Sequence, residues 1–167
     1  MVSAAIERRP AASNPMEIIE QLVAANDWPF ERYGDDELVS HVSAQWCEYS
    51  LWFAWRAESS ALYFSCALDM KVPTHLRNRV YSLLARANDK MWLGHFELWE
   101  EDGLPMFRHT LLAGANPEEV GEQIAAVVRI ALTECERFYP AFQYVVWGGK
   151  DPAAALEAAM VETVGEA

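Results

Sequence analysis

The sequence predicts a single α+β domain in which helices cover one face of an antiparallel sheet of five to six strands. Apolar residues recur every three or four positions in separate stretches, which indicates helices, and they alternate with polar residues between those stretches, which indicates strands. In addition, 52% of the 167 residues are apolar, enough to fill a core. Strands and helices are segregated along the chain in the order α-β-β-β-β-α-β-β-α-α, which favours the α+β class.

The chain is of a length typical of one domain, and no internal repeat is visible in it. Residues 1–13 are rich in alanine and arginine and show no periodicity, so we expect them to form a mobile N-terminal tail. The single domain is expected over residues 14–164.

The helices are predicted mainly from their starts. Asn14 and Asn116 are each followed directly by proline and, within the first turn, by glutamate. These residues supply a capping oxygen, a residue already at the helical φ, and a carboxylate in the first turn. The helix after Asn116 has the most regular apolar stripe, and Pro140 is expected to end or kink it. A basic helix is predicted over residues 73–88, and a short alanine-rich helix after Asp151.

The strands are placed by the turns that bring apolar residues opposite each other. A turn at Glu58 pairs Phe53 with Phe64, and residues 28–33 are an edge strand at most, because Pro29 cannot donate a hydrogen bond to a neighbour. A second turn is expected at Ala44-Gln45, and a two-residue type I′ turn at Asp102-Gly103. These two turns predict the following pairs: Leu38 with Leu51, His41 with Glu48, Leu98 with Phe107, Phe96 with His109, Glu97 with Arg108, and Trp99 with Met106.

No recognisable catalytic motif is present. The sequence lacks the phosphate-loop, dinucleotide-binding, zinc-protease and serine-hydrolase patterns, and its three cysteines are widely spaced. His41 beside Glu48 is interpreted as a cross-strand polar pair, since no nucleophile is predicted near it. We therefore expect no enzyme activity and no catalytic, cofactor-binding or metal-binding residues.

The charge distribution is acidic overall and basic in one segment. A net charge of −12 makes nucleic acid an unfavourable partner, and no stretch is long and apolar enough to cross a membrane. No signal peptide is visible, so we expect a cytoplasmic protein. The basic segment contains Arg77, Arg79 and Arg86, which form either a solvated helix face or a surface for an acidic partner.

Tryptophan is unusually frequent, with seven copies. The predicted strands place several aromatic side chains on the face opposite the phenylalanines. Such a patch is typical of a protein interface. The alternative is that residues 142–147 and the last helix fold over this face. The candidate protein-binding residues on it are Trp46, Trp52, Tyr63, Trp99 and Met106.

Several local strings resemble the YbjN-like family of bacterial sensory transduction regulators. They are Asn14-Pro-Met-Glu-Ile-Ile-Glu, Trp28-Pro-Phe-Glu-Arg, the aromatic run 46–55, and Leu93-Gly-His-Phe-Glu-Leu-Trp with its hairpin into Phe107-Arg-His. The resemblance covers residues 14–147. It implies a fold similar to the type III secretion chaperones and a non-enzymatic, often dimeric protein that binds other proteins. It brings no site residues with it.

Three functional hypotheses follow. The first is a binding or regulatory protein of YbjN type that forms a homodimer and binds a protein partner. The second is a secretion-type chaperone that holds an extended client segment. The third is a small-molecule sensor or enzyme with a pocket between the long helix and the sheet, using His41, Glu48 and His109 as titrating groups.

Overall fold

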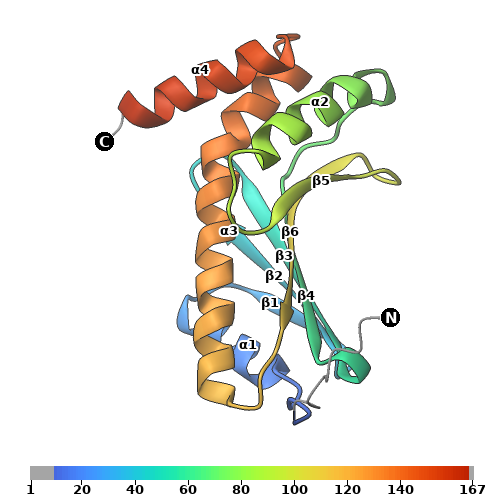
Figure 1. The fold of residues 1–167 in the computed structure, drawn as a ribbon, viewed down its shortest axis with the longest axis vertical. Coiled ribbons are helices and arrows are strands. Elements are labelled where there is room, and N and C mark those ends of the chain that lie inside the picture. Colours follow the sequence, from blue (N-terminus) through green and yellow to red (C-terminus); the bar gives the residue numbers. More distant parts are fainter. Residues whose placement is uncertain (1–9, 166–167) are drawn as a thin grey trace, which may run out of the picture.

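The computed structural model describes residues 10–165 and has the predicted α+β architecture and element order (Figure 1). The helices are α1 (Met16–Ala25), α2 (Arg77–Asn88), α3 (Pro117–Val146) and α4 (Pro152–Gly165). The strands are β1 (Phe30–Tyr33), β2 (Glu37–Ser43), β3 (Glu48–Arg56), β4 (Ala61–Ala67), β5 (His95–Trp99) and β6 (Leu104–Leu112). Short 3-10 helices lie at Ala57–Ser59 and Thr74–Leu76.

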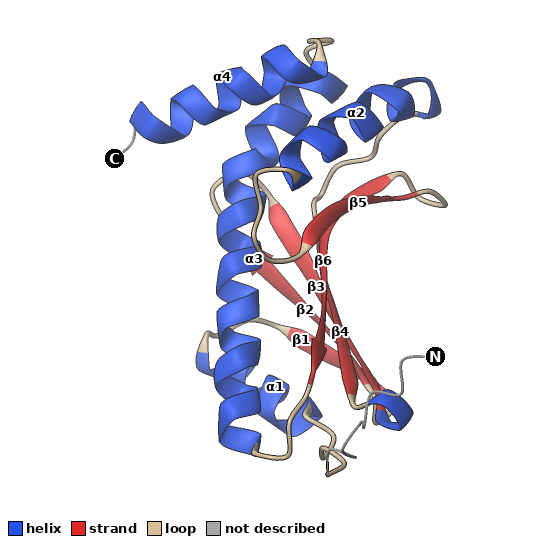
Figure 2. Cartoon of the chain, viewed as in Figure 1, coloured by secondary structure: helices blue, strands red, loops and turns tan. Residues whose placement is uncertain are grey.

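The six strands form one open antiparallel sheet in the order β1-β2-β3-β4-β6-β5 (Figure 2). The edges are therefore β1 and β5. Asn88, at the end of α2, bonds to β5: its amide nitrogen donates to the carbonyl oxygen of Phe96 at 3.0 Å, and its oxygen accepts from the Phe96 amide at 2.6 Å. The Asn88 side chain thus occupies part of the outer edge of β5. The outer edge of β1 is the other free edge of the sheet.

The core lies between the sheet and α3, which runs along one face of the strands (Figure 1). Alternate strand residues point toward this helix, as the burial of Leu38, Leu51 and Phe53 shows. Ser40 also points inward, and its hydroxyl donates to the carbonyl oxygen of Pro29 at 2.9 Å, which satisfies the buried group. One continuous apolar cluster results.

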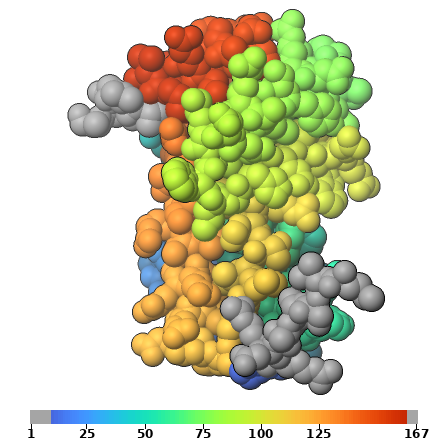
Figure 3. Space-filling view, in the orientation of Figure 1, coloured from blue at the N-terminus to red at the C-terminus, as the bar shows by residue number. Residues whose placement is uncertain are grey.

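The remaining helices pack at the ends of this layer. Helix α1 contacts α3 and β2, whereas α2 contacts α3 and β5 at the other end (Figure 1). Helix α4 packs on α3 and α2, and in the space-filling view α4 and α2 lie side by side at one end of the molecule (Figure 3). The C-terminal helix therefore does not cover the second face of the sheet.

Hydrogen bonds confirm three of the predicted helix starts, whereas the basic helix predicted from residue 73 begins at Arg77, after the 3-10 helix Thr74–Leu76. The Asn14 side-chain oxygen accepts from the Met16 amide at 3.0 Å, and the Asn116 side-chain oxygen accepts from the Glu118 amide at 3.1 Å. Asp151 accepts from the amides of the first residues of α4. These bonds satisfy donors that the first helical turn leaves without an intrahelical partner.

Pro140 was predicted to end or kink the long helix, and it does not end it. Helix α3 contains Pro140 and continues to Val146. Pro140 and the residues around it are buried, and Phe142 packs against Phe96 with ring centroids 5.5 Å apart. The packing of this segment holds the helix together where proline removes one backbone hydrogen bond. Consequently residues 142–146 belong to the core and cannot fold over the opposite face.

The predicted register is correct for one hairpin and shifted by two residues in the others. Phe53 lies opposite Phe64, as predicted. In the β2–β3 hairpin, however, Leu38 pairs with Phe53 instead of Leu51. In the β5–β6 hairpin Phe96 pairs with Phe107 instead of His109. The corrected partners of the other predicted pairs are His41 with Ser50, Glu97 with Met106, Leu98 with Pro105, and Trp99 with Leu104.

The shift has a simple physical cause. Both hairpins have longer connections than predicted: the last pair of β5 and β6 is Trp99 with Leu104, so residues 100–103 form a four-residue loop. Gly103 still takes the expected positive φ, of 70°, at the end of that loop. Because strand side chains alternate with a period of two, a shift of two residues leaves every side chain on its predicted face.

The predicted mobile tail lies mostly outside the described residues. Residues 1–9 are not described, and the described chain begins at Pro10. The Ala12 amide donates to the Ser60 hydroxyl at 3.4 Å, and Ala12 packs against the core. Contacts with the domain thus begin two residues before the predicted start at Asn14.

Candidate functional site

The face of the sheet opposite α3 is the candidate functional site, because none of the four helices packs across it (Figure 2). The side chains on this face are those that alternate with the core residues. Trp52 on β3 and Tyr63 on β4 are half-buried, and Trp99 on β5 is 36% exposed. Met106 on β6 also belongs to this side of the sheet but is buried. The structure therefore confirms the predicted face for these four residues.

The aromatic residues and one ion pair form a connected row across the strands. The rings of Trp52 and Tyr63 meet edge to face with centroids 5.5 Å apart. The Arg108 guanidinium carbon lies 4.8 Å from the centre of the Tyr63 ring, within the range of a cation–π contact. Arg108 also donates to the Glu97 carboxylate oxygens at 3.0 and 3.1 Å. His95 lies 3.3 Å from the same carboxylate and extends the row along the edge strand β5, which also carries Glu97.

This face is concave. A pocket of about 500 Å³ lies on it, and the tip of the β5–β6 hairpin projects to the side away from α3 (Figure 1). Trp99, near the tip, lines the pocket together with Trp52 and Tyr63. The hairpin is held by α2, since Arg77 donates to the Glu100 carbonyl oxygen at 2.6 Å. The remaining lining residues are Glu37, Ala54, Trp55, Arg56, Ser59, Ala61, Arg108 and Thr110.

The chemistry of this surface suits binding. It combines aromatic rings and a guanidinium, which are enriched at protein interfaces, with a carboxylate that pairs with the guanidinium. Arg108 and Glu97 were predicted as neighbours but not as site residues. The alternation of β5 and β6 placed them on the tryptophan face, so this pattern could have identified them. Their contact is diagonal, because Arg108 lies opposite His95.

Trp46 was predicted on the open aromatic face, and the structure places it elsewhere. It lies in the loop between β2 and β3 and stacks on Tyr139 of α3 with ring centroids 6.2 Å apart, away from the open face. The same loop is fixed to α3 by Glu136, which accepts from the Gln45 amide at 3.3 Å and from the Tyr49 hydroxyl at 2.6 Å. Burial and this hydrogen bond raise the pKa of Tyr49, so the hydroxyl stays protonated and donates.

The three candidate arginines of the basic helix have different surroundings. Arg77 holds the β5–β6 hairpin, as described above, and Arg79 donates to the Gly149 carbonyl oxygen at 3.1 Å, which ties α2 to the α3–α4 connection. Arg86 instead lines a groove between α2 and α4. The structure thus does not bring the three arginines together as one surface.

The third hypothesis needs a pocket between the long helix and the sheet, and beside His109 the structure shows a small gap there. The gap beside His109, which Ile124 and Val127 of α3 also line, measures about 10 Å³, too small for a substrate. His109 faces α3, whereas His41 lies on the open face, 3.3 Å from the Ser50 hydroxyl and 3.8 Å from the Glu48 carboxylate. The three titrating groups therefore do not form one site.

Over residues 10–165, no group of three or more histidine, cysteine or acidic side chains is arranged to hold a metal ion. Cys66 and Cys135 are buried with their sulfur atoms 3.6 Å apart, and burial raises the pKa of the Cys135 thiol. No helix in this described part of the chain is both long and apolar enough to span a membrane.

The comparisons with known proteins agree with the strings noted in the sequence. The YbjN family, described as "Putative bacterial sensory transduction regulator", matches residues 15–144, which include the whole sheet and most of α3. This description is that of a regulator and not of an enzyme family. No curated protein and no solved structure matches the chain significantly, so the resemblance to secretion chaperones remains a prediction. The chain belongs to the YbjN family.

Proposed function

We propose that this protein is a non-enzymatic regulator that acts by binding protein, and that the concave face with Trp52, Tyr63, Trp99 and Arg108 is its interface. The observation that carries the proposal is the uncovered aromatic row on that face. The partner that this face binds is a second copy of the chain. In a twofold dimer the same patch meets itself, so a surface that is aromatic and internally ion-paired satisfies both copies.

Covering this row of side chains with another protein surface is energetically favourable. The Arg108 charge is already paired with Glu97, so covering the face does not leave a lone charge without water. The rings of Trp52 and Trp99 then contribute apolar area at little cost in side-chain entropy. Residues of this kind carry most of the binding energy in typical interfaces.

The test is the double substitution Trp52→Ser and Trp99→Ser. We expect the wild-type protein to be a dimer by light scattering coupled to size exclusion, and the variant to be a folded monomer by the same measurement and by circular dichroism. The matched control is Trp92→Ser with Trp147→Ser, because these tryptophans are 104% and 62% exposed and do not line the concave pocket. The control should remain a dimer.

Two results would contradict the proposal. A wild-type protein that is monomeric at high concentration would exclude self-association through this face. Loss of the native circular dichroism spectrum in the Trp52 and Trp99 variant would show that these rings stabilise the fold. The milder variant Trp99→Ser alone separates the two effects, since Trp99 lies on the edge strand and is partly exposed.

A chaperone for an extended client segment is the second candidate. The observation that favours it is the asymmetry of the sheet edges: β5 is capped by Asn88, whereas β1 is an edge on which Phe30 and Tyr33 are 41% and 54% exposed. An added strand would pair with such an edge. Phe30→Pro should abolish binding to a panel of extended peptides, and a panel with no binder would contradict this candidate.

A further inference from the structure

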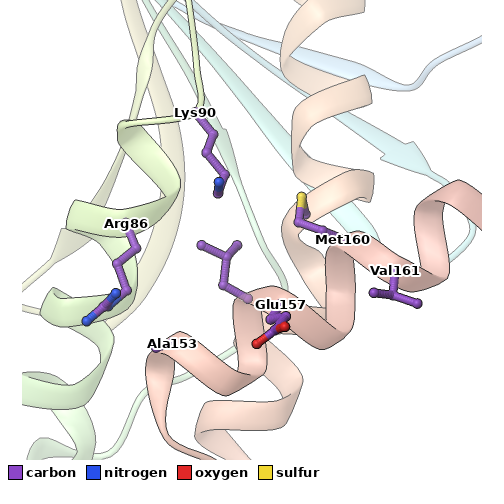
Figure 4. A pocket seen from close by; sticks show the side chains of 7 residues that line it. Arg86, Lys90, Ala153, Glu157, Met160 and Val161 are labelled. Carbon is purple, nitrogen blue, oxygen red and sulfur yellow. The ribbon is translucent and has the colours of Figure 1, made fainter.

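A second surface lies between α2 and α4, at the end of the molecule where these helices pack together (Figure 3). A groove of about 610 Å³ runs between them, a size typical of binding sites. Figure 4 shows Arg86 and Lys90 on the α2 side, and Ala153, Glu157, Met160 and Val161 on α4. None of the groove residues lines the concave pocket of the sheet, so the two surfaces are separate.

The α4 side of the groove is mainly apolar. Ala153, Leu156 and Met160 follow each other at steps of three and four, so they form one stripe along the helix. Leu156 is buried, whereas Val161, at the outer end, is 68% exposed. The stripe thus starts in the core and continues into an apolar surface that is exposed among the described residues.

The α2 side carries positive charge that has no partner within the described part of the chain. Arg86 is on α2 and Lys90 follows two residues after the end of that helix, and both line the groove. Neither makes an ion pair with residues 10–165, in contrast to Arg77 and Arg79, which bond to backbone carbonyl oxygens. Glu157 also lines the groove, but its carboxylate is not within ion-pair distance of either cation.

We propose that this groove binds an amphipathic helix of a partner protein, with acidic side chains beside its apolar stripe. The partner's apolar residues would pack on Leu156, Met160 and Val161, and its carboxylates would pair with Arg86 and Lys90. A helix fits because the stripe on α4 has helical spacing, which matches the ridges of a second helix.

The distribution of charge determines where on the protein an acidic helix binds. The chain has a net charge of −12, so an acidic partner is repelled by most of the molecule. The groove offers two unpaired cations against one acid, a local reversal of sign next to apolar surface. Complementarity of this kind guides an acidic helix to the groove and away from the rest of the surface.

The probe is a fluorescein-labelled peptide of about 18 residues, long enough to form a helix, with leucines at steps of three and four flanked by glutamates. Its control has the same composition with the leucines at alternate positions. Fluorescence anisotropy with the full-length protein should show saturable binding of the helical peptide only. No saturable binding, or equal binding of both peptides, would overturn the proposal.

Three variants test the residues. Arg86→Glu with Lys90→Glu should weaken binding about tenfold or more, because two attractive contacts become repulsive. Arg129→Glu with Lys71→Glu makes the same change in net charge at exposed positions outside the groove and should leave the affinity within about twofold. Glu157→Gln should tighten binding about two- to fivefold, since it removes the one acid of the groove.

The directions of these changes in affinity distinguish binding in the groove from a general effect of net charge. Equal losses in the groove variant and in the Arg129 and Lys71 control would show that only net charge matters, and would overturn the proposal. Val161→Ser should weaken binding, whereas Leu112→Ser, at a position 62% exposed on β6, should not. The Trp52 and Trp99 variant should bind the peptide normally, so failure of the groove and failure of the sheet interface are distinguishable.

Discussion

At the scale of single residues, Arg108 and Gly94 determine the geometry around β5 and β6. Arg108 joins Tyr63 to Glu97 and so links β4, β6 and β5 across the open face. Gly94 precedes β5 with a positive φ of 69°, and a Cβ there would lie 2.2 Å from the Phe107 ring. Only glycine fits this position, because both the backbone conformation and the contact exclude a side chain.

At the same scale, His109 makes the free energy of unfolding depend on pH. Burial against α3, with a smaller contribution from His95, lowers the pKa of His109 in the folded protein. The unfolded chain therefore binds a proton at a higher pH than the folded one, and the free energy of unfolding falls as the pH drops below the usual histidine pKa of about 6.5.

The test measures the midpoint of urea denaturation at neutral pH and at about pH 5, near the acid limit of histidine titration. We expect the wild-type midpoint to fall over this interval, and His109→Gln to lose part of that fall because its side chain does not titrate. His75→Gln, at an exposed position, is the control and should keep the wild-type difference. An unchanged pH dependence in His109→Gln would contradict this assignment.

At the scale of elements, α3 organises the molecule. Its 30 residues span about 45 Å at 1.5 Å per residue, so one helix contacts α1 at one end and α2 and α4 at the other. The helix tolerates Pro140, which costs about 3 kcal/mol in an exposed helix, because Tyr139, Ala141 and Phe142 are buried around it. Packing outweighs local propensity here.

The prediction at this scale concerns the contribution of the Asn116 cap of α3 to stability. Asn116→Ala removes the oxygen that accepts from the Glu118 amide, and should lower the free energy of unfolding by about 1 kcal/mol. Urea denaturation should show a lower midpoint with an unchanged slope. Asn78→Ala, at an exposed position of α2, should change the stability by less than about 0.5 kcal/mol. Equal effects in the two variants would argue against the cap.

At the scale of the whole molecule, the fold presents two uncovered surfaces of different chemistry. The concave face of the sheet is aromatic and internally ion-paired, and the groove between α2 and α4 carries unpaired cations. They lie on different elements, because α4 packs on α3 and α2 and leaves the sheet open. The two proposed interfaces share no lining residues, so the proposals predict that both partners bind without competition.

Salt should affect these two surfaces in opposite directions. Two copies that each carry −12 repel one another, so raising the salt from about 50 to about 300 mM should strengthen dimerisation through the concave face by screening. The same change should weaken binding of the acidic peptide to the groove. Sedimentation equilibrium measures the first effect and anisotropy the second. Dimerisation that weakens with salt would indicate that ion pairs, and not aromatic burial, hold the copies together.

The element order, the starts of α1, α3 and α4, and the face of nearly every strand residue follow from the sequence alone. These features depend on local rules: a period of two in strands, a period near 3.6 in helices, and capping by the residue before the first turn. The assignment of Trp52, Tyr63, Trp99 and Met106 to one face survived a register error, because the error was two residues and the period is also two.

Only the tertiary structure decided the loop lengths, the continuation of α3 through Pro140, the stacking of Trp46 on Tyr139, and the docking of α4 on α2. Each of these depends on contacts between residues far apart in the sequence. The loop length follows from which pairing of strand residues packs the core, and that pairing depends on residues outside the loop. For the same reason no local pattern could reveal that Arg86 and Lys90 face an apolar stripe some 70 residues later along the chain.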